Sequence, residues 1–144
     1  MRERPVNGTV LVRAPSSRLA EGIVTHVRRV PVDVALARAQ HAGYADALAA
    51  SGWMIQPVPV AEECPDSVFI EDAVVVCEDL AVLARPGVPA RRPEVPGVAG
   101  IVRSLGLRTA AIQEPGTLDG GDVLQAGQRC RMPGGWLPCA CLVS

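Results

Sequence analysis

Residues 65–84 read PDSVFIEDAVVVCEDLAVLA. Three carboxylates stand close together in the first half of this stretch: Asp66, Glu71 and Asp72. An apolar run follows them at once, so we expect residues 64–77 to form one buried strand. Taking a carboxylate out of water costs several kcal/mol unless a cation or a hydrogen-bond donor compensates for the lost hydration. The stretch therefore predicts a pocket that receives a cationic group.

The alternation of side chains along a strand sets which acids would face which way. On a strand, Asp66 and Asp72 would share one face, and Glu71 would lie on the other. A planar guanidinium, with its fixed fork of donors, suits paired carboxylates of this kind. The spacing fits a structural explanation equally well, in which the acids cap a turn or pair with Arg13, Arg85 or Arg92.

The surrounding sequence predicts an α/β fold. Glu78 and Asp79 read as a turn, so the strand before them and a strand over 80–84 would form a hairpin. Apolar spacing predicts helices over 32–51 and about 93–105. The remaining expected strands are 8–12, 54–60 (an edge strand, because of its prolines), 107–113 and one beginning at 123. A ββαβ-like unit thus occurs almost twice.

Composition excludes several classes of function. The 144 residues carry a net charge of −1, which argues against a nucleic-acid surface. No apolar run is long enough to cross a membrane and no signal peptide is visible, so we expect a cytoplasmic protein. The five cysteines are odd in number, and their spacing matches neither a disulfide framework nor a zinc site. Cys64 and Cys77 lie in apolar context and read as core thiols.

The last seventeen residues differ from the rest. Residues 128–144 show no clear periodicity and contain three of the five cysteines. We therefore expect two parts, an ordered part over 1–127 and an aberrant tail over 128–144. All 14 basic residues are arginine, which indicates a GC-rich gene. A frameshift near codons 126–130 would produce such a tail, and the downstream DNA tests that hypothesis.

Two further polar clusters have a structural and a functional explanation each. Asp119 and Asp122 flank Gly120-Gly121, which is typical of a tight turn whose glycines supply positive φ. Arg91 and Arg92 follow the breaker Arg85-Pro86-Gly87, where adjacent arginines either hold a ligand carboxylate or are solvated. His26 and His41 are isolated, and neither has the context of a catalytic histidine.

Taken together, three segments resemble the dimethylarginine dimethylaminohydrolases, also called dimethylargininases. They are the run from Pro65 to Asp72, the run from Ala84 to Arg92, and Gly116-Thr117-Leu118-Asp119-Gly120-Gly121-Asp122-Val123. The resemblance covers about residues 8–127, which is the N-terminal half of such a protein. It implies part of a pentein α/β propeller, about two of the five ββαβ modules.

The resemblance implies a reaction and a set of roles. The family hydrolyses methylated arginine to citrulline and a methylamine through a Cys nucleophile and a His acid–base, without a cofactor or metal. Asp66 would bind the substrate α-amino group, and Arg91 its α-carboxylate. Glu71 and Asp72 would face the substrate, with Asp72 on the guanidinium. Asp119 would orient the catalytic His. Ile23 would belong to the loop that covers the substrate.

The family's catalytic His and Cys have no matching position in these 144 residues. We therefore expect a truncated hydrolase that is inactive alone. The alternatives are a non-catalytic guanidinium-binding module, a fragment of an arginine deiminase or amidinotransferase, and one half of a two-piece enzyme with a complementary C-terminal half. The expected partner in each case is a guanidino amino acid, with no nucleic acid and no membrane.

Overall fold

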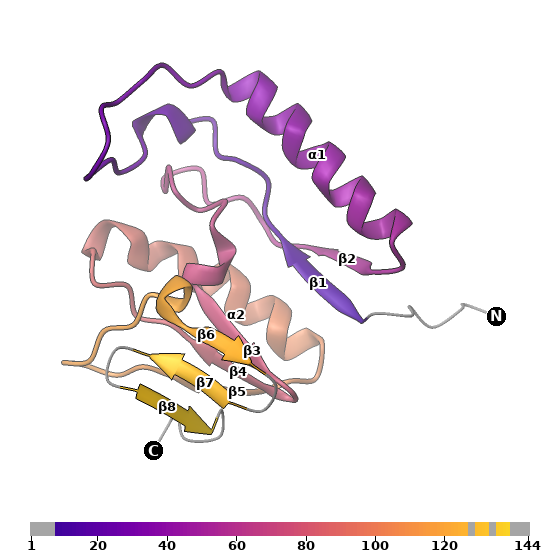
Figure 1. Cartoon of the computed structure of the whole chain (residues 1–144), viewed down its shortest axis with the longest axis vertical. Helices are drawn as coiled ribbons and strands as arrows, with labels where there is room; N and C mark the ends of the chain where they lie inside the picture. The colour runs from indigo at the N-terminus through magenta and orange to yellow at the C-terminus, as the bar shows by residue number, and fades with distance from the viewer. Residues whose placement is uncertain (1–7, 127–128, 133–134, 139–144) are drawn as a thin grey trace. The chain divides into compact units, whose positions relative to one another are not determined.

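The computed structural model describes residues 8–126, 129–132 and 135–138, and its elements are drawn in Figure 1. The chain divides into two compact units, Met1–Ile70 and Glu71–Ser144. The predicted boundary between residues 127 and 128 stays a prediction, and those two residues lie outside the described part.

The first unit is a βαβ arrangement. Strand β1 (Thr9–Val12) pairs in parallel with β2 (Met54–Pro57), and α1 (Val34–Ala50) connects them. A single 3₁₀ turn, η1 (Leu19–Glu21), lies in the loop before α1. The predicted strands 8–12 and 54–60 and the predicted helix 32–51 are therefore confirmed, although β2 stops at Pro57.

The ends of α1 follow from its sequence. The Asp33 carboxylate accepts a hydrogen bond of 2.9 Å from the Leu36 N–H, which caps the first turn. After the helix, Gly52 has a φ of 89°, a conformation that strongly favours glycine. None of the residues of α1 is buried. The helix therefore forms where its pattern predicts, but it contributes little to a core within its own unit.

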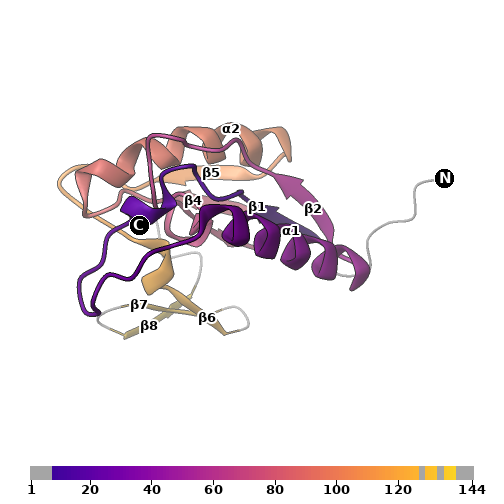
Figure 2. The same ribbon diagram turned by 90° about the horizontal axis from the view of Figure 1, so that it is seen from above.

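The second unit contains one complete ββαβ arrangement. Strands β3 (Val74–Cys77) and β4 (Leu80–Leu83) form the predicted antiparallel hairpin, and β5 (Arg108–Ala111) pairs with β4 in parallel. Helix α2 (Val95–Ser104) makes the crossover, and a 3₁₀ segment, η3 (Pro89–Glu94), leads into it. Figures 1 and 2 show α2 alongside β4 and β5.

Both faces of this sheet are covered. On one face, Val75, Cys77, Leu80, Val82 and Leu118 form a buried cluster. On the other face lies α2, whose Val98 and Val102 are fully buried. Burying a side chain of this size stabilises a fold by about 1.5–3 kcal/mol. A strand covered on both faces reads as a continuous apolar run, which is the pattern of residues 80–84.

The predicted strand over residues 64–77 is wrong in its first half. Only Val74–Cys77 is a strand, and residues 70–72 form a 3₁₀ turn, η2 (Ile70–Asp72). Before this turn the backbone forms local hydrogen bonds instead of strand pairing, and the Phe69 N–H donates to the Asp66 carbonyl at 3.1 Å. Asp and Ser compete with strand pairing by favouring such turns. The predicted division of the acids between two strand faces is therefore wrong as well.

A third small sheet follows the last 3₁₀ turn, η4 (Gly120–Asp122). Strands β6 (Leu124–Ala126), β7 (Arg129–Met132) and β8 (Gly135–Pro138) pair antiparallel in that order. The predicted strand at 123–125 is confirmed. Strands β7 and β8 were not predicted, because residues 128–144 lack the alternation by which strands are recognised.

Candidate functional site

In the first unit, the structure brings Asp66 and Ile23 together, although they are 43 residues apart in sequence. Asp66 is buried, and its Oδ2 accepts a hydrogen bond of 3.0 Å from the Ile23 backbone N–H. Gly22, the residue before Ile23, must be a glycine, because a Cβ at that position would lie 2.4 Å from Asp66 Oδ1. The Ile23 side chain is half exposed. Asp66 therefore holds the loop that presents Ile23.

Arg29 braces the same loop, a role that the sequence did not reveal. Its Nη1 donates to the Ala20 carbonyl and its Nη2 to the Gly22 carbonyl, both at 2.7 Å. One guanidinium thereby bridges two carbonyls that precede Ile23. No residue-type signal marks Arg29, because it lies among several arginines in a stretch without periodicity.

In the second unit, the central feature is a cluster formed by Asp72, Arg91 and Glu94. Arg91 Nη1 donates to Asp72 Oδ2 at 2.7 Å. The other edge of the guanidinium binds Glu94 in a bidentate manner, with Nε to Oε1 at 2.9 Å and Nη2 to Oε2 at 3.0 Å. The structural explanation predicted that the acids pair with Arg85 or Arg92. It is wrong for Asp72, because the ion-pair partner of Asp72 is Arg91.

Burial and charge fix the state of this cluster. The Glu94 side chain is 1% exposed, that of Arg91 13% and that of Asp72 20%. Burial by itself lowers the pKa of Arg91, but the hydrogen bonds and charges of Glu94 and Asp72 outweigh it and hold that pKa above its ordinary value. The guanidinium is therefore a permanent cation between two carboxylates. Glu94 was not among the predicted site residues; its position three residues after Arg91 is the signal that could have identified it.

The glycine pair 120–121 lets segment 71–72 contact the turn that follows Asp119. A Cβ on Gly120 would lie 1.9 Å from the Glu71 carbonyl oxygen. The Gly121 N–H donates to Asp72 Oδ1 at 2.9 Å, and a Cβ there would lie 2.4 Å from the same oxygen. Neither glycine has a positive φ. The expectation that they supply positive φ is thus wrong, since they supply space for close approach.

Asp119 lies beside the loop that contains the predicted arginines. Its Oδ2 accepts a hydrogen bond of 3.2 Å from the Gly87 N–H. The loop is also joined to the turn by backbone pairing between Arg85 and Leu118. The Glu71 side chain is exposed. In the second unit the structure therefore gathers Glu71, Asp72, Arg91 and Asp119 around three short 3₁₀ segments, η2, η3 and η4.

Cys77 belongs to the buried apolar cluster of the second unit and not to the Asp72–Arg91–Glu94 cluster. Cys64 and Cys77 are both buried thiols. Burial, with a smaller contribution from Glu78, raises the pKa of the Cys77 thiol, so it stays protonated near neutral pH. Both histidines belong to the first unit, where the His41 and Tyr44 rings lie 6.5 Å apart. Over the described ranges, no group of His, Cys, Asp or Glu is arranged to hold a metal ion.

Comparison with known proteins gives a consistent result. The chain is 55% identical over 117 residues to the dimethylarginine dimethylaminohydrolase of Streptomyces coelicolor, an alignment that covers 81% of this chain and 45% of that protein. This chain is a relative of the dimethylarginine dimethylaminohydrolases. It spans about half the length of the curated relatives it matches. No family model matches the chain.

Solved structures of dimethylarginine dimethylaminohydrolases are similar to this chain as well. One is an adduct with S-methyl-L-thiocitrulline, with a TM-score of 0.78 and 32% identity over 83% of this chain and 47% of that one. Another is a mutant of the Pseudomonas aeruginosa enzyme complexed with citrulline, with a TM-score of 0.77, 33% identity and the same coverage. The chain therefore has a partial pentein α/β fold, as the resemblance implied. Over the described ranges, neither helix is long and apolar enough to cross a membrane.

Proposed function

We propose that the candidate site residues hold the substrate of a dimethylargininase-type hydrolase. That substrate is a guanidino amino acid such as methylarginine. The observation that carries the proposal is the cluster of Asp72, Arg91 and Glu94, which sets a carboxylate and a guanidinium side by side. A ligand with both a guanidinium and a carboxylate is complementary to such a pair. The citrulline complex of the P. aeruginosa relative supports this ligand class.

The roles proposed for single residues follow the resemblance. Asp66 contacts the α-amino group, Arg91 contacts the α-carboxylate and Asp72 contacts the guanidinium. Asp72 already accepts two hydrogen bonds, from Arg91 and Gly121. A carboxylate offers about four lone-pair sites, so it has the capacity to accept a ligand guanidinium as well.

Three further roles complete the proposal. Glu71 faces the substrate beside Asp72, and its side chain is exposed and therefore accessible. Ile23 covers the ligand from its loop, and its half-exposed side chain is suited to an apolar contact. Asp119 would orient the imidazole of a general acid–base, a group that residues 71–144 do not contain.

We further propose that residues 1–144 bind such a ligand without hydrolysing it. Hydrolysis adds water across the guanidinium C–N bond and releases citrulline and an amine, through a thiolate and an imidazole. The second unit contains no histidine. Cys64 and Cys77 are buried, and the raised pKa of Cys77 disfavours its thiolate. These observations support the absence of turnover by the chain alone.

Calorimetry and a product assay on the full chain test both statements. We expect saturable binding of citrulline and of asymmetric dimethylarginine, weakened by Asp72→Asn, and no citrulline above a blank without protein. Turnover above the blank would contradict the statement on hydrolysis. Absence of binding would contradict the substrate-holding role and would favour a broken enzyme. Restoration of turnover by a co-expressed C-terminal half of a relative would favour a two-piece enzyme.

The identity of 55% to a dimethylargininase favours this substrate over that of an arginine deiminase or an amidinotransferase. Competition separates these alternatives. We expect asymmetric dimethylarginine to displace bound citrulline at lower concentration than arginine does. The reverse order would favour the alternatives.

A further inference from the structure

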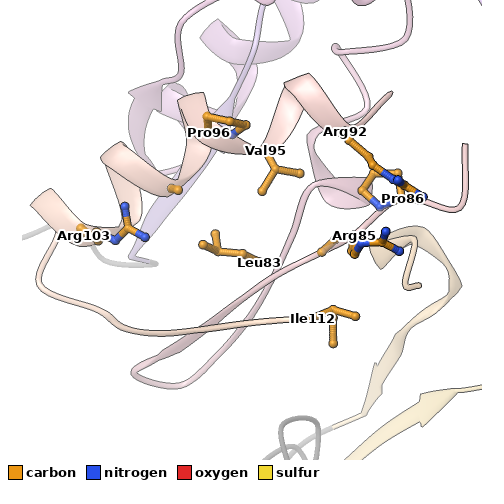
Figure 3. Close-up of a pocket in the computed structure, with 10 residues that line it drawn as sticks. Leu83, Arg85, Pro86, Arg92, Val95, Pro96, Arg103 and Ile112 are labelled. Atoms are coloured by element: carbon orange, nitrogen blue, oxygen red, sulfur yellow. The ribbon is translucent and has the colours of Figure 1, made fainter. Parts of the chain in front are cut away.

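A pocket of about 440 Å³ lies in the second unit, between α2 and the ends of β4 and β5. Its floor is aliphatic and is formed by Leu83, Val95, Ala99 and Ile112. Figure 3 shows Leu83 and Val95 in the middle of the view and Ile112 below them. The volume lies in the range of small-molecule sites, which are about 300–1,000 Å³. None of the residues proposed to hold the guanidino amino acid lines it.

The charged residues that line this pocket are all arginines. They are Arg85, Arg92 and Arg103, and no carboxylate of the described residues lines the pocket. Figure 3 shows Arg85 and Arg92 at one end and Arg103 at the other, with Leu83 and Val95 between them. The pocket therefore has a positive group at each end of an apolar middle.

The pairing of the three arginines differs. Arg85 forms an ion pair with Glu114 and also donates to the Gly116 carbonyl at 3.0 Å, so it serves the loop. The Nε of Arg92 donates to the Pro86 carbonyl at 3.1 Å, which fixes the side chain. Among the described residues, neither Arg92 nor Arg103 has a carboxylate within ion-pair distance. Arg92 and Arg103 therefore keep donors for an external anion.

Helix α2 sets the distance from Val95, which lies three residues after Arg92, to Arg103. Val95, Ala99 and Arg103 are spaced by four residues, so they share one face of α2. Eight residues of helix rise by about 12 Å, and helical side chains lean toward the N-terminus, which tilts Arg103 toward the middle of the pocket. The arrangement fits an extended ligand with an anionic group at each end.

We propose that this pocket binds an aliphatic dicarboxylate, with one carboxylate on Arg92, the other on Arg103 and the methylene chain on the aliphatic floor. The site is separate from the proposed substrate-holding residues. A charge-assisted hydrogen bond contributes about 1.5–3 kcal/mol, so loss of one arginine should weaken binding about tenfold or more. Hexanoate lacks the second carboxylate and should bind more weakly than the dicarboxylate adipate, which has the same number of carbons.

The test uses the full chain labelled with ¹⁵N and titrated with glutarate, adipate, suberate and hexanoate while amide shifts are recorded. We expect saturable shifts at residues 83–86 and 95–103 with the dicarboxylates, and tightest binding at one chain length. Arg103→Gln should weaken dicarboxylate binding about tenfold but leave hexanoate binding unchanged. Arg92→Gln should weaken both. Arg108→Gln, which removes an exposed charge outside the pocket, should change neither.

Three outcomes would overturn the proposal. One is the absence of saturable shifts with any dicarboxylate. Another is equal affinity for adipate in Arg103→Gln and in the unchanged chain. The third is the same shifts and affinity with inorganic phosphate, which would show a general anion site that does not span the two ends. Arg103 is exposed, so its substitution should leave the fold intact, and circular dichroism verifies this.

Discussion

At the scale of single residues, Arg91 is the most constrained of the proposed site residues. It lies between the carboxylate of Glu94, which is 1% exposed, and that of Asp72, which is 20% exposed. Each of its three guanidinium nitrogens donates a hydrogen bond to one of them. A ligand carboxylate that binds Arg91 must share a guanidinium whose orientation is already fixed. Glu94 therefore sets the geometry of Arg91 before any ligand arrives.

The first prediction concerns that buried pair. Glu94→Gln keeps the shape of the side chain but removes its charge, and it leaves Arg91 with one carboxylate instead of two. Breaking a buried ion pair from one side typically destabilises a protein by about 3 kcal/mol. We expect a loss of this order in the free energy of unfolding, measured by urea denaturation.

The chain provides a matched control. Arg18 and Glu21 also form an Arg–Glu pair three residues apart, but both side chains are exposed. Exposed pairs of this kind contribute little, because solvent screens them and side-chain entropy opposes them. Glu21→Gln should leave the unfolding curve almost unchanged. Equal effects of the two substitutions would show that burial of Glu94 does not matter.

At the scale of elements, the proposed residues of the second unit lie on short 3₁₀ segments rather than on helices or strands. Asp72 belongs to η2, Arg91 and Glu94 belong to η3, and Asp119 precedes η4. η2 adjoins β3 and η3 adjoins α2 of the ββαβ arrangement, whereas η4 adjoins β6 of the third sheet. Rigid elements thereby position side chains that turns expose, which is a common division between scaffold and site.

A second prediction tests the close approach of η2 and η4. Gly120→Ala places a Cβ against the backbone oxygen of Glu71, at 1.9 Å before relaxation. Backbone cannot move aside as a flexible side chain can, so we expect destabilisation of about 1–3 kcal/mol or more. Thermal unfolding followed by circular dichroism measures it.

Gly100→Ala is the matched comparison. Gly100 lies within α2 and a Cβ there would meet no atom within 4 Å. Alanine in a helix interior is favoured over glycine by about 0.5–1 kcal/mol. The two substitutions should therefore have opposite signs. A stabilising Gly120→Ala would show that η2 and η4 are not in contact.

At the scale of the whole molecule, the two units differ in how their secondary structure is covered. The first unit has a two-stranded sheet and a helix without buried residues. The second has a three-stranded sheet with a buried cluster on one face and α2 on the other. Two strands alone are at best marginally stable, whereas three strands packed against a helix can be stable by themselves.

A third prediction follows for hydrogen exchange. Amides of β4, the central strand of its sheet, should exchange more slowly than those of β1. We expect a ratio of at least about tenfold, equivalent to ~1.4 kcal/mol of opening free energy. Two-dimensional NMR in D₂O measures both sets in one sample. Equal protection of β1 and β4 would indicate that the two units open together.

The sequence predicted most of the regular elements because their patterns are local. The hairpin around Glu78 and Asp79, the helix before Gly52 and the crossover helix before Gly106 all depend on neighbouring residues. The first half of the acidic stretch was mistaken for a strand, because a run with alternating apolar residues resembles one until local hydrogen bonds compete. Strands β7 and β8 were missed for the opposite reason, since they lack alternation altogether.

The sequence by itself determined the α/β class, the family resemblance and the residue types of the candidate site, because these depend on spacing and local preference. Only the tertiary structure decided the partners. It paired Arg91 with both Asp72 and Glu94. It also brought the Ile23 N–H to Asp66, and it set Gly120 and Gly121 close against residues 71–72. Such contacts join residues up to 49 positions apart. Their geometry depends on how whole elements pack, and no local pattern records that packing.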